Sequence, residues 1–336
     1  MNLNFQKKIS LQSYNTFGIN VLSKQFVGVK STKEIQYVLS QKKNEKILIL
    51  GGGSNILLTK DFDGLTMRIE SKGIKVINEN DEFATLKVAA GENWHDFVLW
   101  CLKNDLGGVE NLALIPGSIG AAPIQNIGAY GAELKSVFSS CEAVSVNSGV
   151  KKIFNKAQCQ FGYRNSIFKN KLKGKYIITS VNFLLKKSPH YINTSYKELN
   201  KKLEGCEKTI QNIAKAVIDI RSEKLPNPKQ IGNSGSFFKN PTIKNSQLEI
   251  LQKKYHKIPY YKDLEGKIKI PAAWMIDTLG LKGFRSGDAG VHKKQALVLV
   301  NYGKADGKDI KALAEKIQLK VFEKFDIILT PEVNII

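Results

Sequence analysis

The stretch IPGSIGAAPIQNIGAYG, residues 115–131, is the most informative part of this chain. It holds four glycines and three alanines in 17 residues, without a charged side chain. Small residues let the backbone approach a flat ligand closely, and the amides of Gln125 and Asn126 can pair with polar groups on the edge of a ring. A purely structural loop of this length and neutrality is unusual. The stretch therefore predicts a binding loop for a flat cofactor.

A second glycine-rich turn, LGGGSN at 50–55, follows an apolar run at 47–50 that predicts a buried strand. Successive glycines allow backbone N–H groups to point together at a diphosphate. The turn differs from the GxGxxG dinucleotide fingerprint, and the residues after it predict another strand instead of a helix. Alone, such a turn is more often a simple link between strands. The two glycine loops together predict a dinucleotide cofactor.

Short apolar segments of helical and strand type alternate along the chain, which predicts an α+β protein. Apolar residues at helical spacing predict helices beginning near Thr32, Trp94, Ile210, Leu248 and Ile310. The polar stretch 189–196 predicts an exposed loop. Strands are predicted at 46–50, 65–69, 84–89, 143–147, 176–185, 296–301 and 327–329.

The composition argues against several classes of protein. A chain of 336 residues, 42% of them hydrophobic, suits two or three domains. The most apolar region, 112–134, carries prolines, glycines and amides that do not suit a membrane span, and the N-terminus lacks the apolar core of a secretory signal. The four cysteines form no CxxC pair, so no metal site is predicted. We expect buried thiols in a reducing, cytoplasmic compartment.

The net charge of +21 raises the question of nucleic acid. Four of the 51 basic residues are Arg, at 68, 164, 221 and 285, and the lysines are spread along the chain. Nucleic-acid readers rely on Arg for bidentate contacts. The diffuse Lys excess is typical of a compositional bias of the source, with weak polyanion binding as the alternative. No nucleic-acid partner is predicted.

Three polar residues stand out for their settings. Arg164, in FGYRNS at 161–166, is a rare arginine, which suggests that its planar fork is required; a surface ion pair is the alternative. Ser236, in GNSGSFFKNP at 232–241, sits on a turn beside two aromatics, and no His-centred triad or GxSxG elbow supports a hydrolase. Glu332 lies in an apolar tail, where its carboxyl group either finds a partner or shifts its pKa, unless the end is frayed.

These segments together resemble the UDP-N-acetylenolpyruvoylglucosamine reductases (MurB) of peptidoglycan synthesis. The matching motifs run in family order over nearly the whole chain, and the loop carrying Tyr196 resembles the type I branch. Asn165 stands where Asp is common, and Ser118 where some members have Cys; neither touches the expected chemistry. The motifs are YNTFG (14–18), LGGGSN (50–55), IPGSIG (115–120), PIQNIGAYG (123–131), GYRNS (162–166), KLPNP (224–228), GNSGSFFKNP (232–241), AAWMID (272–277), GDAGVH (287–292), QAL (295–297) and PEV (331–333).

The resemblance implies an FAD-binding domain of the vanillyl-alcohol-oxidase type and a C-terminal α+β substrate-binding domain. It divides the chain into 1–70 with the tail 320–336, then 71–223, then 224–319. It implies a cytoplasmic, monomeric oxidoreductase of cell-wall synthesis, and through the wall it links the chain to cell shape and division.

The resemblance also implies the reaction. NADPH reduces FAD and leaves, and UDP-N-acetylglucosamine enolpyruvate enters. Reduced flavin N5 then gives a hydride to the vinyl carbon, which yields UDP-N-acetylmuramate.

Residue roles follow from the same resemblance. Arg164 and Glu332 stabilise charge at the substrate carboxylate, with Glu332 donating a hydrogen bond from a raised-pKa carboxyl, and Ser236 protonates the carbon. The implied substrate-binding residues are Tyr163, Tyr196, Lys224, Asn240 and Gln295. The implied cofactor-binding residues are Gly51, Gly52, Gly53, Ser54, Asn55, Pro116, Gly117, Ser118, Gly120, Ala122, Asn126, Ile127, Gly128 and Tyr130.

Two rival functions are disfavoured by the sequence. A flavin oxidase on the same FAD-binding fold is disfavoured by the conjunction of Arg164, Ser236 and Glu332. A basic nucleic-acid-binding protein is disfavoured by the low Arg content.

Overall fold

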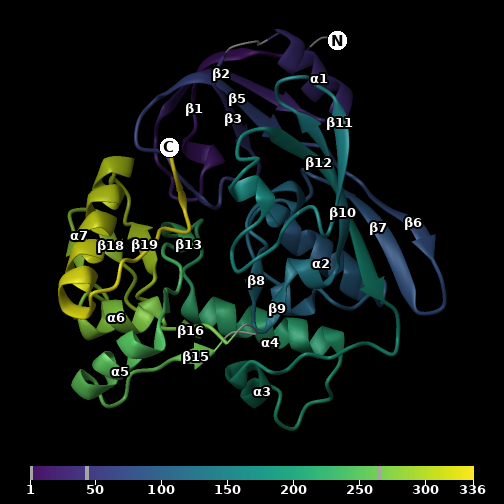
Figure 1. The fold of residues 1–336 in the computed structure, drawn as a ribbon. Helices are drawn as coiled ribbons and strands as arrows, with labels where there is room; N and C mark the ends of the chain where they lie inside the picture. Colours follow the sequence, from purple (N-terminus) through teal and green to yellow (C-terminus); the bar gives the residue numbers. More distant parts are fainter. Residues whose placement is uncertain (1–2, 42–44, 263–265) are drawn as a thin grey trace. The chain divides into compact units, whose positions relative to one another are not determined.

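A computed structural model of the chain describes residues 3–41, 45–262 and 266–336 (Figure 1). It separates into two compact units. Unit 1 comprises Met1–Ile9, Ser23–Gly53 and Phe62–Glu223, and unit 2 comprises Ser10–Leu22, Ser54–Asp61 and Lys224–Ile336. Both units mix helices and strands, which confirms the predicted α+β class. The finer division into three domains stays a prediction.

Unit 1 contains two main sheets. The first has the order β1-β2-β5-β3, with β2, β5 and β3 parallel: β1 (Gln6–Ser10), β2 (Leu22–Val29), β5 (Phe62–Ile69) and β3 (Ile47–Leu50). The second is antiparallel with the order β11-β10-β12-β7-β6: β11 (Lys151–Asn155), β10 (Phe138–Ser145), β12 (Tyr176–Lys186), β7 (Phe83–Ala89) and β6 (Ile74–Glu79).

Helices and short turns complete unit 1 around a buried aromatic core. The rings of Phe97 and Phe183 lie 4.7 Å apart, and Trp94 packs against both. Trp94 Nε1 also donates to Leu112 O at 2.8 Å, so this core anchors the chain just ahead of the 115–131 loop. The elements are α1 (Thr32–Gln41), α2 (Trp94–Lys103), η2 (Glu110–Leu112), η3 (Ile119–Ile124), β8 (Gly128–Ala129), β9 (Ala132–Glu133), η4 (Leu134–Ser136), η5 (Ile167–Lys169), α3 (Lys197–Lys202) and α4 (Ile210–Lys224).

Unit 2 is built on the sheet β13-β19-β18-β17, against which α7 packs. Helix α7 begins with a capping box, in which Asp306 accepts from the backbone of Asp309 and Asp309 from that of Asp306. The elements are η1 (Gln12–Tyr14), β4 (Ile56–Leu57), β13 (Gly232–Ser236), β14 (Thr242–Ile243), α5 (Asn245–Lys254), β15 (Tyr261–Lys262), β16 (Ile268–Lys269), α6 (Ala272–Thr278), β17 (Arg285–Ser286), β18 (Ala289–Val291), β19 (Val298–Asn301), α7 (Gly307–Phe325) and β20 (Asn334–Ile335).

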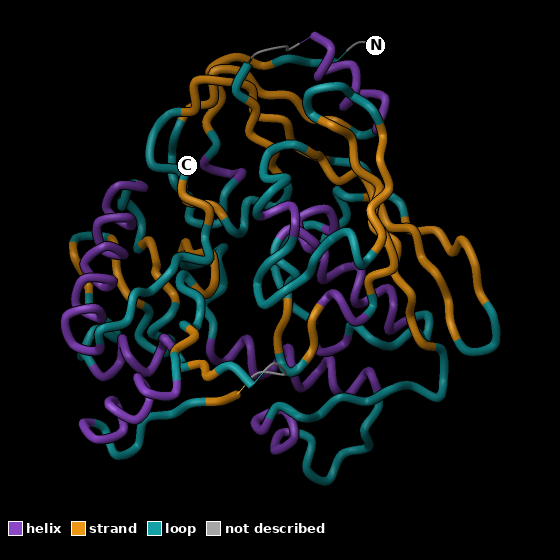
Figure 2. Tube along the Cα trace, in the orientation of Figure 1, coloured by secondary structure: helices purple, strands orange, loops and turns teal. Residues whose placement is uncertain are grey.

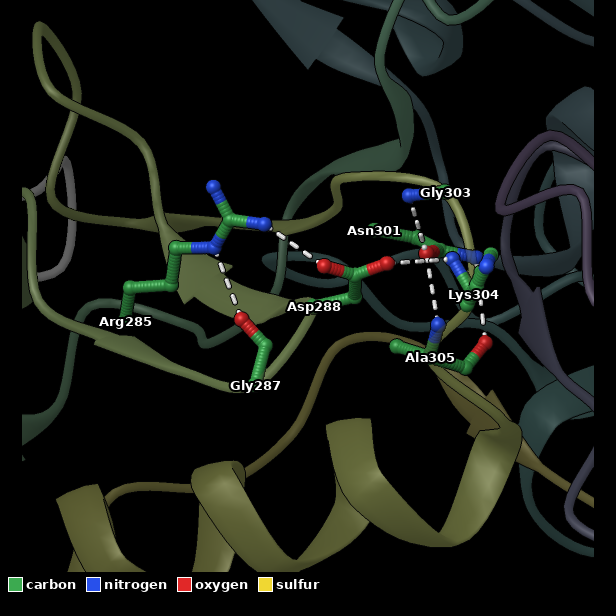
Figure 3. A network of polar contacts seen from close by, with 7 residues as sticks. All are labelled: Arg285, Gly287, Asp288, Asn301, Gly303, Lys304 and Ala305. Carbon is green, nitrogen blue, oxygen red and sulfur yellow. Dashed lines mark hydrogen bonds and ion pairs between the residues drawn. The ribbon is translucent and has the colours of Figure 1, made fainter.

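The motif GDAGVH at 287–292 belongs to a polar network between β17 and the end of β19 (Figure 3). Asp288 accepts hydrogen bonds from Lys304 N at 2.8 Å and from Arg285 Nη2 at 2.6 Å, and these bonds hold the pKa of Asp288 below its ordinary value. Asn301 accepts from the backbone N–H groups of Gly303 and Ala305. The GDAGVH motif therefore has a structural role, because the hydrogen bonds of its Asp288 hold neighbouring turns together.

One predicted strand is wrong. Residues 327–329 form no strand, and β20 lies further on and pairs in parallel with β4. The expected loop at 189–196 is observed, and the described helices include none long and apolar enough to cross a membrane.

Candidate active site

In unit 1 the two glycine-rich loops meet backbone to backbone. A Cβ atom placed on Gly52 would lie 3.0 Å from Gly117 Cα, and one placed on Gly51 would overlap Ser118 Oγ. Gly53 and Gly117 have φ angles of 61° and 120°, which favour glycine. The contacts explain why these positions lack side chains, and they bring together two segments that lie far apart in the sequence.

The 115–131 loop is shaped by Asn126, whose side chain is fully buried. Its Nδ2 donates to Glu133 Oε2 at 3.1 Å and to Gly162 O at 3.0 Å, and its Oδ1 accepts from Lys135 N at 3.0 Å. The side chain is thus committed to the protein, whereas the sequence suggested that it pairs with a ligand ring. These three hydrogen bonds fix the shape of the loop.

The GYRNS motif lies against the same loop. The guanidinium of Arg164 donates to Gly128 O, and it lies 5.5 Å from the centre of the Tyr163 ring. Ser166 Oγ donates to Ile124 O at 2.6 Å. The motif is therefore joined to the loop at both ends, which fixes the planar fork of Arg164.

Left-handed backbone is concentrated around this loop. Of the eight non-glycine residues with positive φ in the described chain, Leu114, Asn126, Tyr130 and Arg164 lie in or beside it. Such conformations cost free energy and persist only where the surrounding contacts enforce them, which often happens at binding sites. The backbone strain points to the same region as the glycine pattern.

A tyrosine and an arginine meet at the end of the loop. Arg221, on α4, donates through Nε to Leu114 O at 3.2 Å, and its guanidinium interacts electrostatically with the Tyr130 hydroxyl. Burial raises the pKa of Tyr130 and lowers that of Arg221. The Tyr196 ring packs edge-on against Tyr130, with centroids 5.1 Å apart. Arg221 therefore adds a second guanidinium to this part of unit 1.

In unit 2 the structure brings the segments of Ser236 and Glu332 side by side. Ser236 ends β13 and is exposed, while Phe237 and Phe238 after it are buried. The chain then pairs with the tail: Glu332 N donates to Phe237 O at 2.8 Å, and Lys239 N donates to Thr330 O at 3.0 Å. Two residues almost 100 positions apart in the sequence are thus set on neighbouring backbone segments.

Comparison with known proteins decides the family. The family model described as "UDP-N-acetylenolpyruvoylglucosamine reductase, C-terminal domain" matches residues 227–336, and the model described as "FAD binding domain" matches 23–151. The reductase of Flavobacterium johnsoniae is 50% identical over 99% of this chain and 100% of its own length. The chain belongs to the UDP-N-acetylenolpyruvoylglucosamine reductase family. The reductase of Pseudomonas putida is 42% identical over the full length of both chains.

A solved reductase shares the fold. The crystal structure of the enzyme from Thermus caldophilus has a TM-score of 0.71 and 22% identity, and it covers 100% of this chain and 99% of its own. The family predicted from the sequence motifs is therefore confirmed, and so are the FAD-binding domain and the class of enzyme.

The remaining predicted residues of this reductase are spread over the two units. Tyr163 and Tyr196 lie in unit 1, and Lys224 is the last residue of α4 and the first of unit 2. Asn240 donates through Nδ2 to the Tyr261 hydroxyl at 2.8 Å and accepts from Ala272 N at 3.0 Å. Gln295 accepts from Leu297 N at 3.4 Å.

The predicted cofactor residues of the reductase are also divided. Gly51, Gly52, Gly53 and all those between 116 and 130 lie in unit 1, whereas Ser54 and Asn55 lie in unit 2. Asn55 Nδ2 donates to Glu332 O at 3.3 Å, which places this end of the turn beside the tail. The roles of these residues stay predictions.

Sequence reasoning missed two residues of this region. Arg221 had a usable signal, because it is one of four arginines in a lysine-rich chain. Asn111 had none: it is a buried amide in the short turn η2, and its importance depends on what lies next to it in space. Among the described residues, no cluster of three or more His, Cys, Asp or Glu side chains could hold a metal ion.

Proposed function

We propose that the chain uses NADPH and bound FAD to reduce UDP-N-acetylglucosamine enolpyruvate to UDP-N-acetylmuramate, in the cytoplasm and as a monomer. The observation that carries this proposal is the pairing of the Ser236 segment with the Glu332 segment inside the reductase-type C-terminal domain. It sets a hydroxyl and a carboxyl group on adjacent backbone, as addition of a hydride and a proton to an unsaturated acid requires.

The two glycine loops of unit 1 suit FAD. A side chain on Gly52 would meet the Gly117 backbone and one on Gly51 would meet the Ser118 hydroxyl, and neutral residues continue to Gly128. Gly51, Gly52, Gly53, Ser54 and Asn55 would hold the diphosphate side, and the residues from Pro116 to Tyr130 the ring side. When bound, FAD supplies the two-electron redox chemistry.

Arg164 and Glu332 act on the substrate carboxylate in this proposal. Hydride addition to the vinyl carbon builds negative charge on the carbon that bears the carboxylate. A guanidinium already fixed by Gly128 O stabilises this charge without reorganising. Glu332 contributes a hydrogen bond when its carboxyl carries a proton.

Ser236 then donates the proton. It is exposed at the end of β13, where buried aromatics follow it, so its hydroxyl is available to a ligand while its backbone stays fixed. Serine is a weak acid, but the enolate-like intermediate is a strong base and the transfer is local. Tyr163, Tyr196, Lys224, Asn240 and Gln295 would hold the nucleotide part of the substrate.

Flavin spectroscopy tests the function directly. Purified protein should be yellow, and NADPH without oxygen should bleach it. UDP-N-acetylglucosamine enolpyruvate should then restore the oxidised spectrum in one turnover. Oxygen restoring the colour as fast as the enolpyruvyl substrate would favour a flavin oxidase instead, and colourless protein that binds no added FAD would refute the cofactor.

A further inference from the structure

The segment 187–196, between β12 and α3, has no regular secondary structure (Figure 2). It carries Tyr196, whose side chain is 42% exposed and so available to a ligand. Backbone hydrogen bonds hold its two ends, where Lys187 N donates to Glu82 O at 2.8 Å and Tyr196 O accepts from Asn200 N at 3.0 Å. Within the described chain, residues 188–195 make no backbone–backbone hydrogen bond, so the geometry of this part depends on side-chain contacts within unit 1.

Asn111, in the short turn η2, supplies the first of these contacts. The residue is 2% exposed, and its Nδ2 donates to Tyr130 O at 2.8 Å and to Asn193 O at 2.9 Å. An amide nitrogen has two hydrogens, and both are used. One buried side chain therefore joins the end of the 115–131 loop to the 187–196 segment.

Further contacts place the two stretches in register. Asn193 Nδ2 donates to Gly131 O at 3.0 Å, and Asn193 Oδ1 accepts from Ser195 N at 3.0 Å. A Cβ atom on Gly131 would lie 2.7 Å from Ser195 Oγ, so the side chain of Ser195 lies directly against the Gly131 backbone. The edge-on packing of Tyr196 against Tyr130 follows from this arrangement.

We propose that Asn111 is a positioning residue that couples the cofactor loop 115–131 to the substrate segment 187–196. The coupling rests on the proposed function of these two stretches. A ligand that fixes the left-handed Tyr130 backbone fixes its carbonyl, hence the Asn111 amide, hence the carbonyl of Asn193 and the ring of Tyr196. If bound FAD strengthens substrate binding at Tyr196 by some factor, bound substrate must strengthen FAD binding by the same factor, because the coupling is reciprocal.

Hydrogen exchange of holoenzyme and deflavinated protein tests the coupling. In the wild-type chain FAD slows exchange in both 115–131 and 187–196. In Asn111→Ala FAD still protects 115–131 but no longer 187–196. Equal protection of 187–196 in wild type and variant overturns the coupling, and so does protection of 115–131 alone in the wild type. If FAD protects neither stretch in the wild type, the proposed cofactor site is wrong instead.

Asn193→Ala gives a second test that leaves the core intact. It removes the bond to Gly131 O and the acceptor for Ser195 N, and we expect KM for the enolpyruvyl substrate to rise roughly fivefold, as for a lost hydrogen bond, with reduction by NADPH retained. Thr194→Ala is the matched control, because the Thr194 side chain makes no hydrogen bond within the described chain, and it should keep the wild-type KM.

A double-mutant cycle then separates positioning from bulk stability. If Asn193 acts through Tyr196, the KM of Asn193→Ala with Tyr196→Ala equals that of Tyr196→Ala alone. Additive effects on KM, or equal slowing of both half-reactions by Asn193→Ala, overturn the proposal. A wild-type KM in Tyr196→Ala removes Tyr196 from the site and refutes that part of the proposed function. If Asn111→Ala does not fold, Asn111→Ser takes its place in the hydrogen-exchange test, because a hydroxyl has one hydrogen and cannot donate to both Tyr130 O and Asn193 O.

Discussion

The 115–131 loop of unit 1 and the Ser236 segment of unit 2 are held in different ways. The loop depends on side chains: Asn126 is bonded on three sides, and Arg164 reaches back to Gly128 O. The Ser236 segment depends on backbone hydrogen bonds to β19 and to the tail. A side chain can therefore be changed on the Ser236 segment without moving it, whereas changes on the loop alter structure and binding together.

The largest effect is expected for Ser236→Ala. The backbone pairing survives, so the free energy of unfolding, FAD binding and reduction by NADPH stay near the wild-type values. Reoxidation by the enolpyruvyl substrate slows by roughly 10²–10⁴-fold, the usual range for a lost general acid. Stopped-flow absorbance measures both half-reactions. Ser236→Cys retains part of the activity, because a thiol donates a proton from nearly the same place, and a normal reoxidation rate in the Ala variant would end the assignment.

Gly128→Leu tests the 115–131 loop, where structure and binding are expected to change together. Its Cβ would lie 2.8 Å from Arg164 Nη1 and 2.9 Å from Ala132 O, so Arg164 and the loop must move. Overpacking of this kind costs about 1–3 kcal/mol, which weakens FAD binding by roughly 5- to 150-fold. Titration of deflavinated protein with FAD measures the loss.

Gly162→Ala is the control for that change. A Cβ there meets nothing nearer than Asn165 Cβ at 3.7 Å, so FAD affinity should persist. If the Gly128→Leu protein keeps its flavin as tightly as the wild type, the loop does not contact the cofactor.

A smaller effect is expected from Tyr196→Phe and Lys224→Ala. Each removes a polar group proposed to contact the UDP part, worth about 1–1.5 kcal/mol, so KM should rise roughly 5- to 10-fold. Reduction by NADPH persists in Tyr196→Phe. Lys224→Ala also slows that step if the lysine meets the nicotinamide nucleotide. Steady-state kinetics combined with the NADPH half-reaction distinguish these cases, and unchanged constants in both variants would take the residues out of the site.

The smallest expected effect is on the pH dependence of stability, through the titration of His95. Its Nδ1 accepts from Leu114 N at 3.0 Å, and burial lowers its pKa below the ordinary value, with Asp96 opposing and Arg221 assisting. The unfolded chain therefore binds this proton more readily. Stability from the neutral ring is present above pH ~6.5 and is lost as the pH falls from there through the lower folded pKa.

Solvent screening keeps the contribution of His95 to the free energy of unfolding below about 1 kcal/mol. Thermal unfolding between pH 5 and pH 8 measures it. His95→Asn, whose amide oxygen accepts without titrating, should flatten this part of the profile. An identical pH dependence in the variant would show that the bond to Leu114 is not the cause.

Local patterns predicted much of the fold. Ile35, Val38 and Leu39 recur at helical spacing, and they are the buried face of α1. The apolar run 47–50 became β3, with three glycines at the turn after it. Such features succeed because helices and buried strands bury one face at a fixed period, which sequence alone displays. The strand predicted at 327–329 is absent because a short apolar run also occurs in tail segments outside strands. Whether such a run pairs as a strand depends on residues elsewhere in the chain.

The family, the α+β class and the candidate chemistry could all be read from the amino-acid sequence, because glycines, a rare arginine and the order of short motifs are visible without coordinates. Three features became visible in the folded chain alone: Asn126 bonds within its own loop, Arg221 bonds Leu114 O, and Asn111 joins two stretches. They could not be predicted because the partners lie far apart along the chain. Asn111 and Asn193 are 82 positions apart, and the hydrogen bond between them exists only once sheets and helices have placed both.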